Sequence, residues 1–538
     1  MKNNFLSRWL FLLTIIPALV FADSSVTSPN PKLYSDAMRA DFASTASGKS
    51  VALVGYMPVD ARSVASMVQV KPGKVVSVKD YGAVANGLTD DAPAFRKAIA
   101  HLATRGGGTL LMPAGSYFLD SFDSAAISQD EYAAFVLTSG VILKGESNNS
   151  TSLKISATLQ SRVPTGMVQG GGRINFIGVK SGAVGAIVRD INFDYNGIVL
   201  KDLSFRSYNA VRSAGNDILI ERIRAINAPG RNVIVASSGA TFRDSVITNG
   251  NQNVRGNSAA NDSSFVYLNG KDNLVENNVF SNTVTAISNS GGVEIHATNS
   301  KVLNNKFINL FPAIYDGIED GTVANNNQIK GNYFENCKGG VHSVGKHRGW
   351  IIANNRFVDS NVAPWWAIMT PRDDLTGVTS AGVQENVTIE NNTFETVSGD
   401  PQRSYIRVAG FQNSVIKGNK FNGNVAPVSF IVSTTETKNV SVVDNLFKNP
   451  PSSRFTFGQV HLSGDNNGKW GGAFTDILVK NNRFLNDKAL PVPSNIYPFA
   501  SSGKGNLTFT NNKALDNQIV NINVCSGGPK GRLSNEKQ

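Results

Sequence analysis

Short runs in which apolar and polar residues alternate recur through most of the chain. Residues 387–390, 440–443 and 477–480 all show this pattern. Because successive side chains of a strand point to opposite faces, such runs predict strands with one buried face. Helical patterns of about 10 to 15 residues, which would indicate a sheet with crossover helices, do not separate the runs. The pattern therefore predicts an all-β fold.

A phrase of the form Asn-Asn-x-Phe, in some copies with Gly or Asp first, follows the predicted strands eight times. Its phenylalanines are 23 to 37 residues apart: Phe280, Phe307, Phe334, Phe357, Phe394, Phe421, Phe447 and Phe484. Such a repeat is typical of stacked units rather than one compact core. Asn tolerates the left-handed backbone of a sharp turn, and stacked amide side chains can hydrogen-bond to each other. We predict a single-stranded parallel β-helix with these Asn residues at its corners and the Phe residues inside.

An amphipathic helix is predicted shortly after residue 89. Thr89 or Asp90 can cap its first turn, and Pro93 fits that turn. Its apolar face consists of Phe95, Ala98, Ile99 and Leu102. Because the open end of a solenoid exposes strands without neighbours, we interpret this helix as an N-terminal capping helix.

Several short motifs surround this helix. They are Val-Lys-Asp-Tyr-Gly-Ala at residues 78–83, Asp90-Asp91, Gly-Gly-Gly at 106–108 and Pro-Ala-Gly-Ser-Tyr at 113–117. Together they resemble the N-terminal segment of the pectate-lyase-like right-handed parallel β-helix superfamily. That superfamily includes phage tailspike depolymerases, polygalacturonase-related proteins and mannuronan C5-epimerases. The resemblance implies a right-handed solenoid, but these families differ in their reactions, so we assign Asp90 and Asp91 to the cap.

The first residues have the features of a secretory signal. Lys2 and Arg8 precede or begin an apolar stretch at residues 9–21, and Val-Phe-Ala at 20–22 fits a cleavage site. These 13 positions are too few to span a bilayer, so we expect no stable membrane insertion. The predicted organisation is a signal peptide at 1–22, a leader or linker at 23–73, the β-helix at 74–526 and a frayed tail at 527–538. We expect a secreted protein, extracellular or periplasmic.

The basic charge of the chain indicates the class of partner. The formal net charge is +11, and removal of Lys2 and Arg8 leaves +9. A sequence pI of about 9.4 favours acidic partners through long-range attraction. Nucleic acid is not expected, because the chain lacks a basic run or a recognised binding motif and is predicted to be exported. We expect an acidic polysaccharide as the partner, and the sequence does not specify an oligomeric state.

The strands that follow each Phe predict where chemistry could take place. When their apolar residues are placed inward, the middle residues face solvent, one per coil, and form a column. The predicted members of this column are Tyr267, Glu294, Glu319, His342, Met369 and Arg407. His296, Asp316, Asp320, His347 and Arg348 are expected on the same or adjoining positions. We predict that the column is the active groove.

Two reactions fit the predicted column. In β-elimination of a uronate polysaccharide, His342 or His296 would be the base, Tyr267 the acid, and an arginine would neutralise the uronate carboxylate. The candidate arginines are Arg407, Arg348 and Arg372. In hydrolysis, Glu294 and Glu319 would act together, because one of two neighbouring carboxyl groups tends to keep its proton. Trp365 and Trp366 could stack on sugar rings.

A third reaction, C5-epimerisation, is indicated by one motif. Glu294-Ile295-His296 is similar to the Asp-Pro-His signature of the C5-epimerases, with Asp320 one coil later, but Glu replaces Asp and Ile replaces Pro. The sequence requires no cofactor, although Asp316, Glu319 and Asp320 offer oxygen ligands for Ca²⁺. We predict a secreted lyase acting on an acidic polysaccharide, with a glycoside hydrolase, a uronan C5-epimerase and a non-enzymatic adhesin or polysaccharide-binding protein as alternatives.

Overall fold

A computed structural model describes residues 74–524, apart from internal gaps. The longest gaps are 160–172, 199–206, 251–262, 371–382, 397–404, 449–459, 464–473 and 486–494. The predicted signal peptide, the leader at 23–73 and the tail at 527–538 fall outside the described residues. Within the described part, no helix is both long and apolar enough to cross a membrane.

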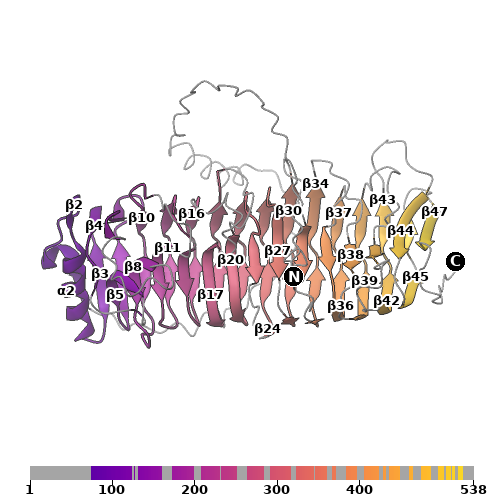
Figure 1. Cartoon of the computed structure of the whole chain (residues 1–538), viewed down its shortest axis with the longest axis horizontal. Coiled ribbons are helices and arrows are strands. Elements are labelled where there is room, and N and C mark those ends of the chain that lie inside the picture. The colour runs from indigo at the N-terminus through magenta and orange to yellow at the C-terminus, as the bar shows by residue number, and fades with distance from the viewer. Residues whose placement is uncertain are drawn as a thin grey trace, which may run out of the picture. The chain divides into compact units, whose positions relative to one another are not determined.

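Three long parallel sheets, of 18, 15 and 14 strands, are built from successive turns of the chain. Neighbouring strands within each sheet come from successive coils, as Figure 1 shows. This arrangement is a single-stranded right-handed parallel β-helix, so the predicted fold class is confirmed. We refer to the three sheets, in the order of decreasing strand number, as the first, second and third sheet.

The third sheet carries the predicted groove. Its strands, in chain order, are β5 (Tyr132–Leu137), β8 (Arg173–Val179), β11 (Ser207–Ser213), β14 (Asn232–Ala236), β17 (Ser264–Lys271), β20 (Gly291–Thr298), β23 (Ile314–Asp316), β27 (Gly339–Ser343), β31 (Trp366–Thr370), β35 (Ile406–Val408), β38 (Val428–Ile431), β41 (Val460–Ser463), β44 (Asn495–Ser501) and β47 (Ile519–Val524). Each of these strands lies in parallel beside the strand of the next coil.

The Asn-Asn-x-Phe phrase forms the corner between the first and second sheets, for example between β25 (Gln328–Lys330) and β26 (Tyr333–Glu335). The first Asn of each full copy has a positive φ, such as 55° at Asn354. The second Asn accepts two hydrogen bonds from the second Asn of the preceding coil, at 2.9 to 3.1 Å. This ladder consists of Asn278, Asn305, Asn332, Asn355, Asn392, Asn419, Asn445, Asn482 and Asn512, and it confirms the predicted role of the phrase.

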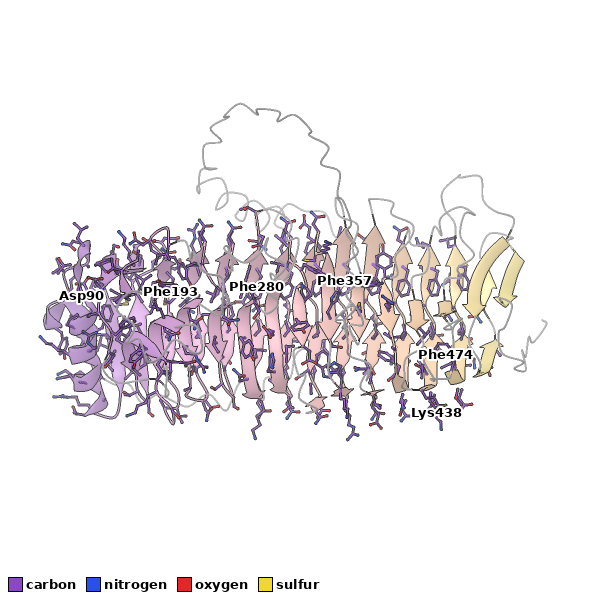
Figure 2. The ribbon with its side chains drawn as sticks, viewed as in Figure 1. Asp90, Phe193, Phe280, Phe357, Lys438 and Phe474 are labelled. Carbon is purple, nitrogen blue, oxygen red and sulfur yellow. The ribbon has the colours of Figure 1, made fainter. Side chains whose placement is uncertain are left out.

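The phenylalanines of the repeat form a continuous stack inside the β-helix. From Phe280 to Phe484 the ring centroids of successive coils lie 4.4 to 5.2 Å apart and the rings are nearly parallel. Figure 2 labels Phe280 and Phe357 of this stack. All of these rings are buried, so the stack contributes apolar burial at every coil and keeps the coils in register.

The predicted amphipathic helix is α2 (Ala92–Ala103), at the first coils. Its buried face includes Phe95, whose ring stacks on Phe135 of β5 at 4.5 Å. Asp91, just before the helix, is buried and accepts hydrogen bonds from the backbone N–H groups of Val84 and Phe118. These contacts agree with a structural role for Asp91. That α2 protects the open end of the sheets stays a prediction.

Candidate functional site

The third sheet presents one outward register position per coil. Backbone pairing connects these positions directly, and from β17 to β35 they are Tyr267, Glu294, Tyr315, His342, Met369 and Arg407. We call these six residues the outer column. The pairing agrees with the predicted column at five positions and differs from it at one.

The prediction that Glu319 belongs to the column is wrong, because Tyr315 pairs with both Glu294 and His342. Strand β23 begins at Ile314, four residues before the Ile318 on which the alignment relied. Either isoleucine can begin an alternating run, so the pattern alone fits both registers. Ile314 pairs with Val293 and with Val341, so the structure has the earlier register.

Solvent exposure also differs from the prediction that every outward residue faces solvent. Glu294 is 2% exposed, His342 1% and Met369 0%, whereas Tyr267 and Arg407 are partly exposed. Parallel strands lie only about 4.8 Å apart, so large side chains in one column cover each other. The outer column is therefore a packed surface on which Tyr267, Tyr315 and Arg407 are partly exposed and the other three residues are buried.

Four polar side chains form a compact group on β17 and β20. Tyr267 pairs with Glu294 and Asn269 pairs with His296, so the four occupy two neighbouring positions on each strand. Glu294 Oε1 lies 2.8 Å from His296 Nε2, and the His296 ring stacks on the Tyr267 ring with centroids 4.5 Å apart. We call Tyr267, Asn269, Glu294 and His296 the His296 cluster.

Hydrogen bonds fix the orientation of the His296 ring. A carboxylate only accepts, so His296 Nε2 carries the proton that it shares with Glu294, and Nδ1 holds the lone pair of the neutral ring. Ser264 donates its hydroxyl to the other carboxylate oxygen, Glu294 Oε2, at 3.0 Å. The side chain of His296 is 25% exposed, whereas that of Glu294 is only 3% exposed. The cluster thus presents an oriented imidazole to solvent, with a buried carboxylate behind it.

His342 has a different environment from the one that a general base requires. Its Nε2 donates to the backbone carbonyl of Trp366 at 3.1 Å, and its ring meets Phe311 edge-on at 5.9 Å. Gly339 leaves room for the ring, because a Cβ at that position would lie 2.5 Å from the imidazole. This burial favours a positioning role for His342 over the predicted catalytic role.

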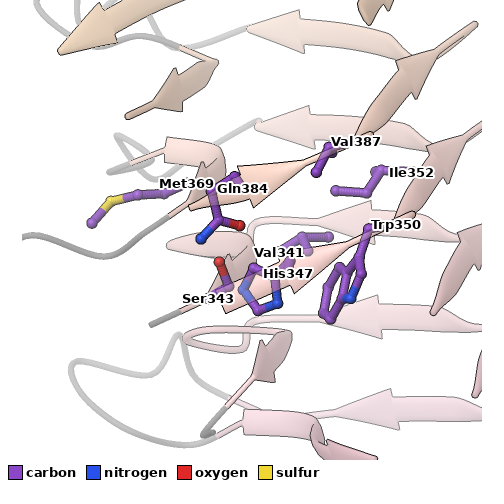
Figure 3. A pocket seen from close by; sticks show the side chains of 8 residues that line it. All are labelled: Val341, Ser343, His347, Trp350, Ile352, Met369, Gln384 and Val387. Atoms are coloured by element: carbon purple, nitrogen blue, oxygen red, sulfur yellow. The ribbon is translucent and has the colours of Figure 1, made fainter. Parts of the chain in front are cut away.

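Asp316 and His347 lie inside the β-helix rather than on the predicted outer face. Asp316 is registered with the buried Ile295 and is itself fully buried, and His347 Nε2 lies 3.1 Å from its Oδ2. A cavity of about 10 Å³ adjoins His347, Ser343 and Gln384. Figure 3 shows the side chains that line it. The sequence pattern missed this arrangement because polar residues at inward positions break the rule of alternation.

Burial lowers the pKa of His347 to about 3, from about 6.5 in an unfolded chain. The Asp316 carboxylate acts against this lowering of the pKa, because it favours the imidazolium. Since His347 is only 2% exposed, we infer that burial has the larger effect and that the imidazole is neutral. Below pH 6.5 the unfolded chain then binds a proton that the folded chain does not. We expect His347 to remove about 1.4 kcal/mol from the free energy of unfolding for each pH unit below 6.5.

Denaturant unfolding from pH 7 to 4.5 checks this, with His347→Gln as the comparison. The Gln variant should lose stability less steeply on acidification than the wild-type protein. Parallel curves for the two proteins would show that His347 does not titrate as its burial implies.

Five predicted residues lie elsewhere than expected or outside the described part. Arg348 belongs to β28 (Lys346–Arg348) of the first sheet, where it binds Glu385 at 2.9 Å, so its predicted place beside the column is wrong. Glu319, Asp320, Arg372 and Trp365 fall outside the described residues. Trp366 and Arg407 are described, and the guanidinium of Arg407 lies over the Trp366 ring at 4.6 Å.

Of the residues suggested for Ca²⁺, the structure describes Asp316, and this residue does not fit an outward metal site. Asp316 is directed to the interior, where the imidazole of His347 lies beside it. In the described ranges, no group of three or more His, Cys, Asp or Glu side chains is arranged to hold a metal ion. We therefore derive no step through calcium.

Solved structures with the same fold include two mutants of the tailspike protein of E. coli bacteriophage HK620, each in complex with a pentasaccharide. One has a TM-score of 0.59 at 15% identity, over 92% of this chain and 86% of the tailspike chain. The other has a TM-score of 0.59 at 16% identity, over 89% and 84%. A family model described as rhamnogalacturonase A/epimerase, pectate lyase-like, matches residues 75–342. The chain belongs to the pectate-lyase-like parallel β-helix superfamily.

Curated relatives within this superfamily come from Azotobacter vinelandii. Mannuronan C5-epimerase AlgE4 is 28% identical over 176 residues, which is 32% of this chain and 30% of the relative. Mannuronan C5-epimerase AlgE1 is 33% identical over 95 residues, 18% of this chain and 6% of the relative. Alginate lyase 7 is 34% identical over 79 residues, 15% and 9%. The chain thus spans less than a third of each of these relatives.

Two members of the site were not anticipated from the sequence. Asn269 belongs to the His296 cluster through strand register, and Ser264 donates a hydrogen bond to the Glu294 of that cluster. Neither residue stands out in a sequence rich in Ser and Asn. Asn269 could have been found from the Asn-Asn-x-Phe repeat, because it lies 27 residues before His296 and several successive Phe residues of the repeat are also 27 residues apart.

Proposed function

We propose that the protein cleaves an acidic, uronate-containing polysaccharide by β-elimination at the His296 cluster. The observation that carries this proposal is the contact between Glu294 Oε1 and His296 Nε2, with the His296 ring stacked on Tyr267. The comparisons support the coarser statement that a protein of this superfamily acts on or binds polysaccharides.

The first step is removal of the C5 proton of a uronate residue. His296 Nδ1 takes this proton, and the resulting imidazolium is stabilised by the Glu294 carboxylate at 2.8 Å. Ser264, bound to the second carboxylate oxygen, holds Glu294 in this orientation. A base that is oriented before the substrate arrives does not have to reorganise during the reaction.

The second step is loss of the leaving group. The electron pair from the C5–H bond forms a C4–C5 double bond, the C4–O4 bond breaks, and the Tyr267 hydroxyl protonates O4. The proton on His296 then returns to Tyr267 through solvent, which restores both groups. Stacking of the two rings keeps the acid and the base within one sugar residue of each other.

Charge must also be neutralised on the uronate carboxylate while the C5 proton leaves. Asn269 is the described neighbour in direct register with His296. One of its amide N–H groups points to the carbonyl of Ala236 at 3.4 Å. A carboxamide donor at this position can stabilise the developing negative charge on the substrate carboxylate, as oxyanion donors do in other enzymes.

Hydrolysis and epimerisation are the competing chemistries. The Glu294 and Glu319 pair required for hydrolysis loses its basis, because Tyr315 occupies the position next to Glu294. Epimerisation shares the first proton transfer and differs only in that C5 is then protonated from the opposite face. The mannuronan C5-epimerases among the relatives favour it as the second candidate.

A panel of acidic polysaccharides distinguishes these reactions. We expect ultraviolet absorbance to rise as the unsaturated uronate forms, together with new reducing ends, and Glu294→Gln to abolish both signals. Reducing ends without absorbance would indicate hydrolysis. Exchange of the C5 hydrogen with solvent, without cleavage, would indicate epimerisation, and binding without any of these signals would leave the adhesin interpretation.

A further inference from the structure

The geometry points to a distal subsite, formed by Arg407 and Trp366, that binds the carboxylate of a uronate residue far from the scissile bond. This inference takes one assumption from the proposed function, namely that an acidic polysaccharide lies along the third sheet. It adds a requirement for substrate length, because the subsite can be reached only by a long oligomer.

Strand register sets the distance between the two sites. Glu294 and Arg407 are separated by four register steps, through Tyr315, His342 and Met369. Parallel strands lie about 4.8 Å apart, so these steps amount to roughly 19 Å along the stack. One strand spacing is similar to the length of one sugar ring in an extended chain. A chain parallel to the stack therefore places about one sugar beside each coil.

Packing beneath Trp366 makes this subsite a built feature rather than an isolated surface cation. The guanidinium carbon of Arg407 lies 4.6 Å from the centre of the Trp366 ring. The backbone carbonyl of Trp366 accepts a hydrogen bond from His342, which is 1% exposed. Gly339 pairs with Trp366 on the neighbouring strand and leaves space for the His342 ring. Buried groups thus fix the strand that carries the aromatic support of Arg407.

The chemistry of the pair selects a negatively charged sugar. A guanidinium that stacks on an aromatic ring directs its N–H groups sideways, in the plane where a carboxylate can accept two parallel hydrogen bonds. The indole adds an apolar surface for the C–H face of the sugar. A neutral sugar would use only the second of these contacts, so the expected ligand is a uronate.

Affinity for oligomers of increasing length tests the subsite. Glu294→Gln protein, in which turnover is blocked, is titrated with size series of oligomannuronates, oligoguluronates and oligogalacturonates. We expect a gain in affinity once an oligomer is long enough to span the roughly five coils from Glu294 to Arg407. In the double variant that carries both Glu294→Gln and Arg407→Gln, that gain in affinity should be smaller by about tenfold to a hundredfold. This is the affinity that one hydrogen bond to a charged group contributes.

Arg483→Gln, which removes a cation of β43 (Arg483–Leu485) in the second sheet, is the matched control and should leave the gain unchanged. Arg407→Lys should restore only part of the gain, because an ammonium does not bind bidentately. The inference is overturned if lengthening brings the same gain with and without Arg407. Cleavage without an Arg407-dependent gain would reject the subsite alone, and such a gain without any cleavage would reject the proposed reaction alone. Absence of both binding and cleavage in all three series would reject both.

Discussion

Replacing His296 with alanine is expected to lower the turnover of the acidic polysaccharide by roughly 10²- to 10⁴-fold, the usual contribution of a general base. The substitution removes the group that takes the C5 proton, and it also leaves the Glu294 carboxylate without the imidazole that it binds at 2.8 Å. Initial rates measured from ultraviolet absorbance, with substrate in excess, check the prediction. Substrate affinity should change much less than turnover.

Controls separate loss of chemistry from loss of structure. His101→Ala removes a histidine of α2, which lies at the first coils and is remote from β17 and β20, and it should retain full activity. Tyr267→Phe keeps the ring that stacks on His296 but removes the proton donor, so it should also slow turnover while the fold remains intact. If His296→Ala keeps more than about a tenth of the wild-type rate, the base is another residue and the mechanism fails.

The repeat made most of the fold predictable, because each residue type in it suits one particular place in the coil. A left-handed corner every coil favours Asn, Asp or Gly, and the corner residues Asn354, Asp444 and Gly418 all have positive φ. A buried amide one residue later must find partners, and it finds them in the same residue of the next coil. The sequence therefore predicts both the corner and the ladder that stabilises it.

Register outside the repeat was less predictable, and the error at Glu319 shows why. The distance from the Phe to the next strand of the third sheet depends on a connecting segment that varies from coil to coil. Ile314 and Ile318 each fit the start of a strand, and the two choices are separated only by the pairing of Ile314 with the neighbouring coils. A shift of four residues keeps the inward and outward sides, so the alternation pattern gave no warning.

Burial of outward residues was the second feature that the pattern could not predict. Glu294 and His342 were both expected on a solvated face, yet both are nearly fully covered. What distinguishes them is their neighbours: Glu294 binds an exposed imidazole, whereas His342 binds a backbone carbonyl. Contacts between coils decide whether such a group can reach a substrate. These contacts cannot be predicted from the sequence of a single strand.

The Asn ladder also makes a strong prediction about stability. Asn355 accepts two hydrogen bonds from Asn332, and it donates to the carbonyl of Ile329 and to the side chain of Asn392, all at 2.9 to 3.0 Å. Asn355→Leu fits a similar volume but removes all four bonds and leaves their partners buried. Each buried group without a partner costs about 1 to 3 kcal/mol, so the free energy of unfolding should fall by roughly 3 to 6 kcal/mol.

Asn326→Gly is the matched control, because Asn326 also contacts an Asn of the preceding coil, at 3.2 Å, but on the exposed surface. Its φ of 56° suits glycine, so this substitution should change stability by less than about 1 kcal/mol. Urea unfolding gives the global change, and hydrogen exchange locates it. The backbone N–H of Asn332 loses its acceptor in Asn355→Leu and should exchange faster, together with amides of the adjoining coils. Equal effects of the two substitutions would contradict the prediction. They would show that an Asn residue stabilises the fold through the contact between amides alone, whether or not that contact is buried.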